Sequence, residues 1–259
     1  MKDKVKKIIK EAGADLVGIA SVDRFERALP GCTPTDILPR AEAVIAIAGR
    51  IPRGSLESGN MRLVTNAWNM VNAELNKAAY KGARFLEDHG HLAAVIPAFL
   101  PIEMLQRHGL VGDLSLKHAA AMAGIGILGF SGLLLTPQFG PRQRLSAVVT
   151  DAPLEPDPLL KEDFCAQCTE KNCVRACPAE AIKGNTKGIE KLKCLDRYQK
   201  FGGRALVRLL RKLIETPDAE ERIKLLKFPT VLEFYELHQF LRVGGVACAE
   251  CMRACPVGT

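Results

Sequence analysis

The sequence predicts an α+β protein in which helices flank a mainly antiparallel or mixed sheet, followed by a smaller cysteine-rich domain. Short apolar runs alternate with helical stretches of very unequal length, which favours this class over regular βαβ repeats. Eight of the nine cysteines lie after residue 159. With 259 residues, 47% of them hydrophobic, the chain can bury a full core and still carry a second domain. We therefore expect a core over 1–159 and a cysteine domain over 160–259, with a helical insertion at about 195–244.

The strands of the core are predicted from apolar runs rich in Val, Ile and Leu. Most of these runs are bounded by Gly or Pro, which interrupt regular structure. The expected strands are 16–20, 43–48, 92–99, 133–136 and 145–150.

The helices are predicted from apolar stripes and end signals. A lysine-rich helix over 5–11 is closed by Gly13, and a long helix over 60–88 carries an apolar stripe and is closed by Gly90. An alanine-rich helix over 114–123 is capped from Asp113 or Ser115. The segment 151–158 holds three prolines and is expected to be a linker.

No charged residue lies between Ala119 and Pro141. That length raises the question of a membrane span, but five glycines and Pro137 interrupt it, so we expect a buried or ligand-facing segment and no membrane association. Gly124 to Gly129 spells G-x-G-x-x-G. A dinucleotide site needs a strand before that motif, whereas a helix is predicted here, so we expect the glycines to let backbone approach a large flat ligand.

Positive charge is concentrated in one segment. The net charge is +7, and residues 183–212 hold ten Lys or Arg against Glu190 and Asp196. Within it, Arg204, Arg208, Arg211 and Lys212 follow one face of an amphipathic helix. This pattern is typical of a solvated helix face, or of a docking surface for an acidic redox partner or a nucleic acid.

The cysteines fall into two runs that each end in Cys-Pro. The first is C-x2-C-x4-C-x3-C-P and the last is C-x2-C-x3-C-P, the spacing used by bacterial two-cluster ferredoxins. In that pattern three close thiolates hold one cluster and the distant cysteine before proline ligates the other. The predicted ligand sets are Cys165, Cys168, Cys173 with Cys255, and Cys177, Cys248, Cys251 with Cys194.

Two alternatives compete with a pair of 4Fe-4S clusters. Structural zinc also uses C-x2-C knuckles, although the Cys-Pro endings and the x3 spacing favour iron and sulfide. Disulfides are less favoured, because nothing near Met1 resembles a signal peptide and we expect a reducing, cytoplasmic location. Cys32 is left as the spare.

Several motifs together resemble one superfamily. Ser115-Leu-Lys-His118, Gly132-Leu-Leu-Leu-Thr-Pro137, Phe139-Gly-Pro-Arg142 and the cysteine runs are similar to the epoxyqueuosine reductases and corrinoid reductive dehalogenases. The resemblance implies a nitroreductase-like core that binds a cobalamin, fused to a two-cluster ferredoxin domain that feeds it electrons; flavin is the alternative cofactor. It also implies a pocket lined by the segment 119–141. The expected cofactor-binding residues are Gly124, Gly126, Gly129, Gly132, Leu133, Leu134, Pro137, Gly140, Arg142 and Arg144.

The chain departs from that superfamily at the reacting groups. The acidic residue and arginine that precede the glycine segment in epoxyqueuosine reductases have no counterpart, nor does the tyrosine proton donor of the dehalogenases. Asp113, Lys117 and His118 are the candidate catalytic residues, because reduction ends by protonating the product.

We expect a reductase acting on a small-molecule or corrinoid substrate and supplied by a low-potential ferredoxin or flavodoxin. The alternatives are a protein that reduces a cofactor held by a partner, and an enzyme acting on transfer RNA, which the missing positions disfavour.

Overall fold

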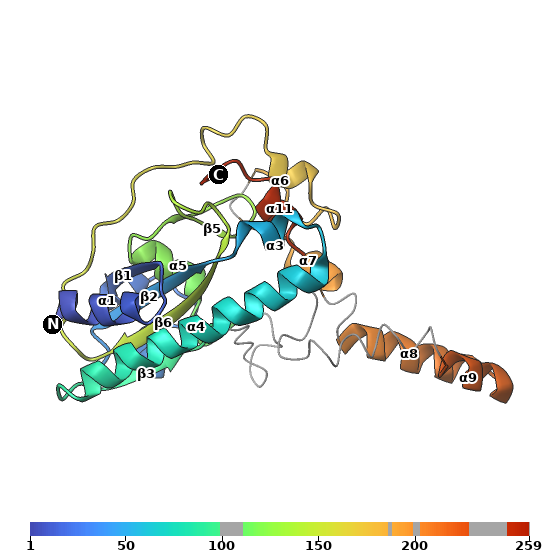
Figure 1. Ribbon diagram of the computed structural model, residues 1–259, viewed down its shortest axis with the longest axis horizontal. Helices are drawn as coiled ribbons and strands as arrows, with labels where there is room; N and C mark the ends of the chain where they lie inside the picture. Colours follow the sequence, from blue (N-terminus) through green and yellow to red (C-terminus); the bar gives the residue numbers. More distant parts are fainter. Residues whose placement is uncertain (99–110, 186–187, 199–202, 228–247, 259) are drawn as a thin grey trace.

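The computed structural model describes residues 1–98, 111–185, 188–198, 203–227 and 248–258. Its centre is a four-stranded sheet in the order β1-β2-β6-β3, in which every neighbouring pair is antiparallel (Figure 1). The strands are β1 (Leu16–Ser21), β2 (Ala43–Arg50), β3 (Ala93–Ile96) and β6 (Gln143–Thr150).

Both faces of this sheet are buried, and the alternation of side chains divides them between two cores. Ile45 and Ile47 of β2 join the cluster on one face, whereas Val44 and Ala46 join the cluster on the other. Successive residues of a strand point to opposite faces, so a strand that is apolar throughout is suited to this central position.

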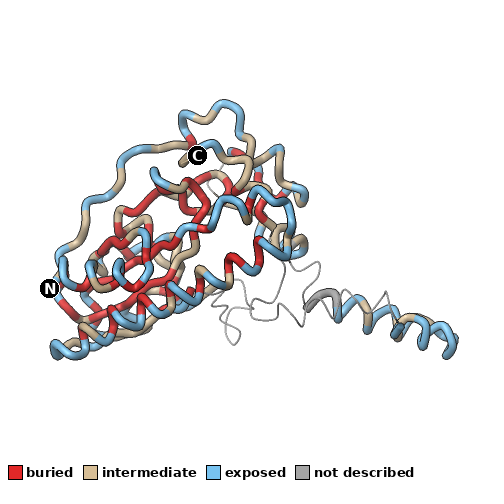
Figure 2. Tube along the Cα trace, viewed as in Figure 1, coloured by how far each residue is buried: buried red, intermediate tan, exposed pale blue. Residues whose placement is uncertain are grey.

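Helices cover the two faces in separate layers. On one face, α1 (Lys2–Glu11) packs on α4 (Met61–Glu87), and α4 lies along β6, β3 and β2. On the other face, α5 (Leu116–Met122) contacts β1, β2 and β6. The predicted α+β sandwich with an antiparallel sheet is therefore confirmed, and Figure 2 shows its buried centre.

One predicted strand lies elsewhere. Residues 133–136 were expected beside the other strands, but β5 (Leu134–Leu135) pairs with β4 (Ile127–Leu128) in a separate two-stranded sheet. Between them Gly132 has a φ of +67°, which favours glycine. The glycine-rich segment thus folds on itself as a small hairpin after α5.

Three short helices precede α4, namely η1 (Val22–Phe25), α2 (Pro34–Ile37) and α3 (Arg53–Glu57). The proline-rich segment after β6 runs along the outside of the sandwich (Figure 1). It is attached by Asp157, whose carboxylate accepts from Lys6 at 2.7 Å and from the Ile19 amide at 2.9 Å. The predicted linker therefore has a fixed path over α1 and β1.

The cysteine region consists of short helices that pack on the sandwich. They are α6 (Asn172–Arg175), α7 (Lys191–Tyr198) and α11 (Glu250–Arg253). Ala249 and Met252 share a hydrophobic cluster with Leu56, Val64 and Trp68 from the region of α3 and α4. The last cysteine run is therefore held by the core as well as by its own region.

Two further helices, α8 (Gly203–Glu215) and α9 (Ala219–Leu225), extend away from the sandwich (Figure 1). They fall within the predicted helical insertion, of which residues 199–202 and 228–244 lie outside the described residues. In the ranges that the structure covers, no helix has both the length and the apolar character needed to cross a membrane.

Candidate functional site

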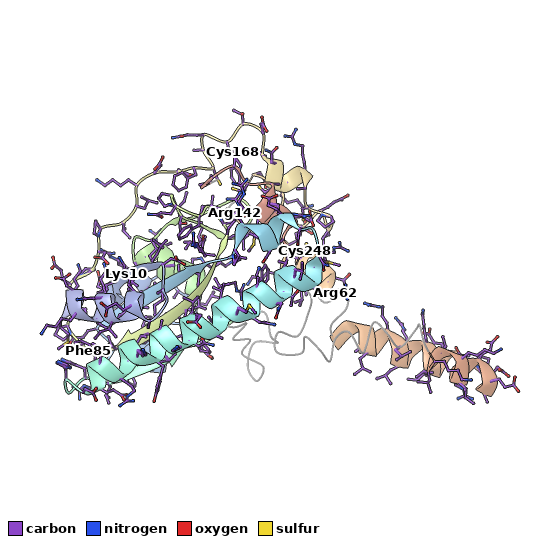
Figure 3. All side chains as sticks on the ribbon, in the orientation of Figure 1. Lys10, Arg62, Phe85, Arg142, Cys168 and Cys248 are labelled. Carbon is purple, nitrogen blue, oxygen red and sulfur yellow. The ribbon has the colours of Figure 1, made fainter. Side chains whose placement is uncertain are left out.

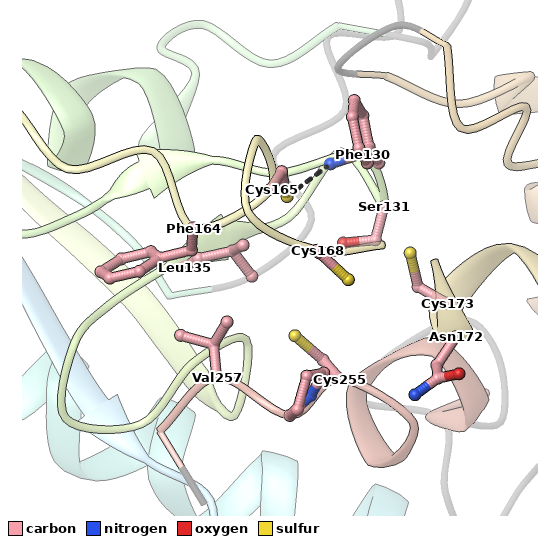
Figure 4. A pocket seen from close by; sticks show the side chains of 11 residues that line it. Phe130, Ser131, Leu135, Phe164, Cys165, Cys168, Asn172, Cys173, Cys255 and Val257 are labelled. Atoms are coloured by element: carbon pink, nitrogen blue, oxygen red, sulfur yellow. Dashed lines mark hydrogen bonds between the residues drawn. The ribbon is translucent and has the colours of Figure 1, made fainter. Parts of the chain in front are cut away.

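Four cysteines from three segments surround one small hollow. Figure 4 shows the thiols of Cys165, Cys168, Cys173 and Cys255 pointing into a common space. Phe130, Ser131 and Leu135 of the glycine-rich hairpin form one wall, together with Phe164, Asn172, Pro256 and Val257 from the cysteine runs. We call this the first cysteine group.

Local hydrogen bonds set the position of Cys165. The Asp163 carboxylate accepts from the amides of Cys165 at 3.1 Å and Ala166 at 3.2 Å, which closes a tight turn. The Phe130 amide lies 3.4 Å from the Cys165 thiol and donates to it. Backbone N–H groups aimed at a sulfur stabilise its thiolate form, the form that binds metals.

Apart from Cys32, the remaining cysteines make up what we call the second cysteine group, namely Cys177, Cys194, Cys248 and Cys251. Cys194 lies on α7, whereas Cys251 lies on α11. Burial raises the pKa of Cys251 to about 12, and the thiolates of Cys248, Cys194 and Cys177 add to the shift. Burial also raises the pKa of Cys194, again with Cys248 and Cys177 as its neighbours.

In the first cysteine group, too, burial and neighbouring thiolates raise a cysteine pKa. Burial raises the pKa of Cys173, and the nearby thiolates of Cys255, Cys165 and Cys168 add to it. A partly buried thiol whose neighbours disfavour its ionisation, such as Cys173, becomes a thiolate more readily when a cation binds. Within the described part of the chain, no three Cys, His, Asp or Glu side chains are placed to hold one metal ion.

The three candidate proton donors lie at or before α5, and only two are brought together. Lys117 donates from Nζ to the Gly132 carbonyl at 2.6 Å. His118 lies 2.6 Å from the Ser115 hydroxyl. Burial lowers the pKa of both side chains, and each also feels the positive charge of Lys191, while the Cys194 thiolate opposes the shift of Lys117. Asp113 is exposed just before the helix.

The glycines in and around the hairpin face other protein atoms, whereas they were expected to face a large flat ligand. At each one, the place where a Cβ would project is filled by the protein itself. Gly126 meets the backbone of Leu135, and Gly140 meets the backbone of Val257. Gly124 and Gly132 meet Pro158 and Ile189, while Gly129 meets first the Leu135 side chain and then the Cys165 sulfur. The glycines thus allow close packing of the cysteine region and the linker on the hairpin.

Arg142 and Arg144 were expected to contact polar groups of a cofactor, but they bind protein groups. Arg142 is 9% exposed and donates to the carbonyls of Cys255 and Val257. Arg144 donates to Asn72 at 2.9 Å and lies 4.8 Å above the Trp68 ring. These contacts could not be predicted because they join positions about 70 to 115 residues apart.

The remaining predicted cofactor-binding residues, Leu133, Leu134 and Pro137, lie in three different environments. Leu134 is buried in the core cluster under α5, and Leu133 packs against the cluster around Trp68. Pro137 is exposed. A second hollow lies between α3 and α4, and its lining contains none of the predicted cofactor residues: Pro52, Gly54, Ser55, Leu63, Asn66, Ala67, Met70 and Val71.

Sequence reasoning missed the side chains that wall the first cysteine group. Phe164 and Asn172 each directly precede a cysteine, so the sequence could have indicated that they lie beside this group. Phe130 had no such signal, and its place depends on the fold of the hairpin. Its ring also lies 5.4 Å from the Lys171 ammonium.

The α+β sandwich and the cysteine groups packed on it can be compared with known proteins. No protein-family model matches the chain. The tetrachloroethene reductive dehalogenase of Dehalobacter restrictus is 39% identical over 113 residues, which are 42% of this chain and 18% of that protein. The epoxyqueuosine reductase of Bacillus subtilis is 28% identical over 186 residues, which are 70% of this chain and 44% of that protein.

Solved structures show the same fold. The epoxyqueuosine reductase of Streptococcus thermophilus aligns with a TM-score of 0.59 at 19% identity, covering 100% of this chain and 66% of that one. A catabolic reductive dehalogenase aligns with a TM-score of 0.62 at 18% identity, covering 98% of this chain and 31% of that one.

The predicted resemblance is confirmed: the chain is related to the epoxyqueuosine reductases and the reductive dehalogenases. The two curated relatives described above are both named as reductases. The matched regions span less than half the length of these two proteins.

Proposed function

We propose that this protein is an iron-sulfur oxidoreductase that holds two 4Fe-4S clusters for electron delivery to a corrinoid-type acceptor. The observation that carries the proposal is the gathering of eight cysteines into two groups of four. Each group combines residues from distant parts of the sequence, and Cys255 joins residues 165–173 across more than 80 positions.

The first cysteine group fits a four-iron cluster in its donors and in its walls. Four thiolates are the donor set of such a cluster, in which each sulfur ligates a different iron. The thiols lie around a shared hollow rather than around one point, and apolar side chains such as Phe130, Phe164 and Leu135 line it. Apolar walls keep water away from the site and help to set its potential.

The second cysteine group fits the same donor set. Cys194 of α7 supplies the thiol that the last run lacks, since it interacts electrostatically with Cys248 and Cys177. The Ala181 amide lies 3.4 Å from the Cys177 thiol and donates to it. Four-iron clusters supply one-electron transfer at potentials set by charge, hydrogen bonding and exposure. In this chain, the residues around each cysteine group would set the charge, hydrogen bonding and exposure of the cluster.

The contacts of the predicted cofactor residues bear on which acceptor the chain uses. The described glycines and arginines expected around a corrinoid are engaged with protein groups, so they do not supply the predicted cradle. This observation favours a second candidate function, in which the chain reduces a corrinoid or another cofactor held by a partner protein.

A docking surface for an electron donor is supported by the basic segment. Arg208, Arg211 and Lys212 are exposed on α8. We propose that this helix receives an acidic ferredoxin or flavodoxin, since charge complementarity speeds such encounters. One solved relative is described with an epoxyqueuosine-modified tRNA stem loop, so a stem loop of that kind is a competitor to test on the same surface.

Composition of the protein is the direct test. After anaerobic purification and reconstitution we expect about eight irons and eight sulfides per chain. Cobalt analysis and flavin fluorescence on the same sample then separate the acceptors. One corrinoid per chain supports the leading proposal, whereas full clusters without cobalt support delivery to a partner. Zinc without sulfide would overturn both, and tightly bound flavin would make the acceptor a flavin.

A further inference from the structure

Arg142 is a buried cation whose hydrogen-bond acceptors all belong to backbone carbonyls. Its Nη1 donates to the Val257 carbonyl at 2.7 Å and lies 3.4 Å from the Phe139 carbonyl, while its Nη2 donates to the Cys255 carbonyl. The guanidinium therefore joins the loop before β6 to the chain on either side of Pro256. Figure 3 labels Arg142 just below Cys168, which lines the first cysteine group.

The backbone around this contact is built for close approach. Gly140 and Gly258 have φ values of +54° and +66°, and a Cβ on either would collide with the backbone of the other segment. The Arg142 amide donates to Phe139 at 3.0 Å, and its carbonyl accepts from Ile51 at 2.9 Å. Arg142 is thus fixed at its backbone and at its side chain, and Cys255 is held through it.

Among the described residues no carboxylate is hydrogen-bonded to Arg142, and Glu57 acts on it only through its charge. Burial lowers the pKa of this guanidinium, while the Cys255 thiolate and, after it, Glu57 favour its charged form. A buried cation that faces only carbonyls is costly unless an anion lies nearby. A four-iron cluster with four thiolates is an anion, and it gains one more negative charge on reduction.

We propose that Arg142 positions the Cys255 ligand and raises the reduction potential of a cluster in the first cysteine group. The proposal rests on the proposed function, because it needs a cluster there. A fixed positive charge stabilises the reduced form more than the oxidised form, since the reduced form is the more negative. Arg142 is therefore a positioning and tuning residue for electron transfer rather than a contact to the acceptor.

The test compares R142M and R142K in a C251A background, which is designed to keep only the first cluster. The matched control is R84M, since Arg84 is exposed in the last turn of α4 and its loss changes the net charge by the same amount. Solvent screens an exposed charge, so R84M should leave the potential unchanged. The readouts are iron content, the paramagnetic resonance signal of the reduced cluster and its potentiometric titration.

We expect R142M to lower the ratio of reduced to oxidised cluster at a fixed potential by about tenfold, which is about 59 mV for one electron. R142K keeps the charge but not the two-pronged hydrogen bonding, so its potential should stay near that of the parent while iron is lost faster in air. If R142M does not fold, faster iron loss in R142K still tests the positioning role.

Two results would overturn the inference. One is a potential in R142M that equals that of R84M, and the other is an iron lifetime in R142K that equals that of the parent. A parent chain that binds no iron contradicts the proposed function instead, so the two failures are distinguishable.

Discussion

The two cysteine groups have the same four-thiol composition but are attached to the sandwich in different ways. The first lies against the glycine-rich hairpin, and Arg142 ties its last ligand to the loop before β6. The second depends on α7 and α11, and Lys117 of α5 is its nearby cation. The fold therefore gives two chemically equal sites unequal surroundings, which is the condition for unequal potentials.

Removal of one ligand from each group gives the largest expected effect. C255A should lose the first cluster, whereas C194A and C251A should each lose the second, so about four of the eight irons disappear in every case. Iron analysis and paramagnetic resonance of the reduced proteins measure this. An intact pair of clusters in C194A would show that this cysteine belongs to neither group.

Assembly of the second cluster should depend steeply on pH. The pKa of Cys251 is raised to about 12, so this thiol is protonated at neutral pH and must release its proton to bind iron. We expect affinity for iron and sulfide to rise by about tenfold per pH unit and per proton released between pH 7 and 9. Reconstitution of C255A, which keeps the second group, measures it, and C251A is the comparison.

In the metal-free protein, by contrast, the raised pKa of Cys251 makes the stability of the fold decrease as the pH rises. A pKa raised on folding adds stability below the ordinary thiol value, and this stability is lost as the pH rises toward about 12. The metal-free chain should therefore unfold more easily in alkali, and C251A should lose less. Equal pH dependence of the two metal-free proteins would contradict the burial of Cys251.

Lys117 allows the second site to be changed without touching a ligand. K117M removes an ammonium that interacts with Cys194, so the second cluster should become harder to reduce. The expected shift is about 40 mV for each kcal/mol of attraction lost, with the first cluster unchanged. Potentiometric titration in the C255A background, which keeps only the second cluster, measures this shift, and the same titration of K117M in the C251A background follows the first cluster. A shift of the first cluster instead would reverse the assignment of Lys117.

The smallest effect is expected at Asp163, whose carboxylate accepts from the amide of Cys165 in the first cysteine group. D163A removes the acceptor for the Cys165 and Ala166 amides and should cost about 1 kcal/mol of unfolding free energy. Thermal unfolding measures it, and E170A on the exposed neighbouring loop is the control. Similar losses in both variants would mean that the Asp163 turn adds nothing specific to this site.

Much of the sandwich was predictable because its signals are local. The buried strand at 43–48 is apolar at every position, and the long helix at 60–88 carries a continuous apolar stripe. Both are found as β2 and α4 with boundaries shifted by one or two residues. The hairpin was misplaced because residues 133–136 have strand composition, and composition alone does not name the partner strand.

At the site, the spacing of the cysteines indicated the kind of metal centre, but the sequence did not indicate which way the arginine side chains point. The Cys-Pro runs indicate a pair of clusters from the sequence alone. The arginines after the glycines were predicted to bind the cofactor. Arg142 turns to Cys255 and Val257, and Arg144 turns to Asn72 and Trp68.

The sequence by itself determined most strands and helices of the core and the spacing of the eight cysteines proposed to bind clusters, because each is encoded by residues close together in the chain. Only the tertiary structure decided which segments fill the space beside the glycines and which cation lies beside each cysteine group. Those contacts join residues up to 115 positions apart, and their geometry follows from packing the whole sandwich.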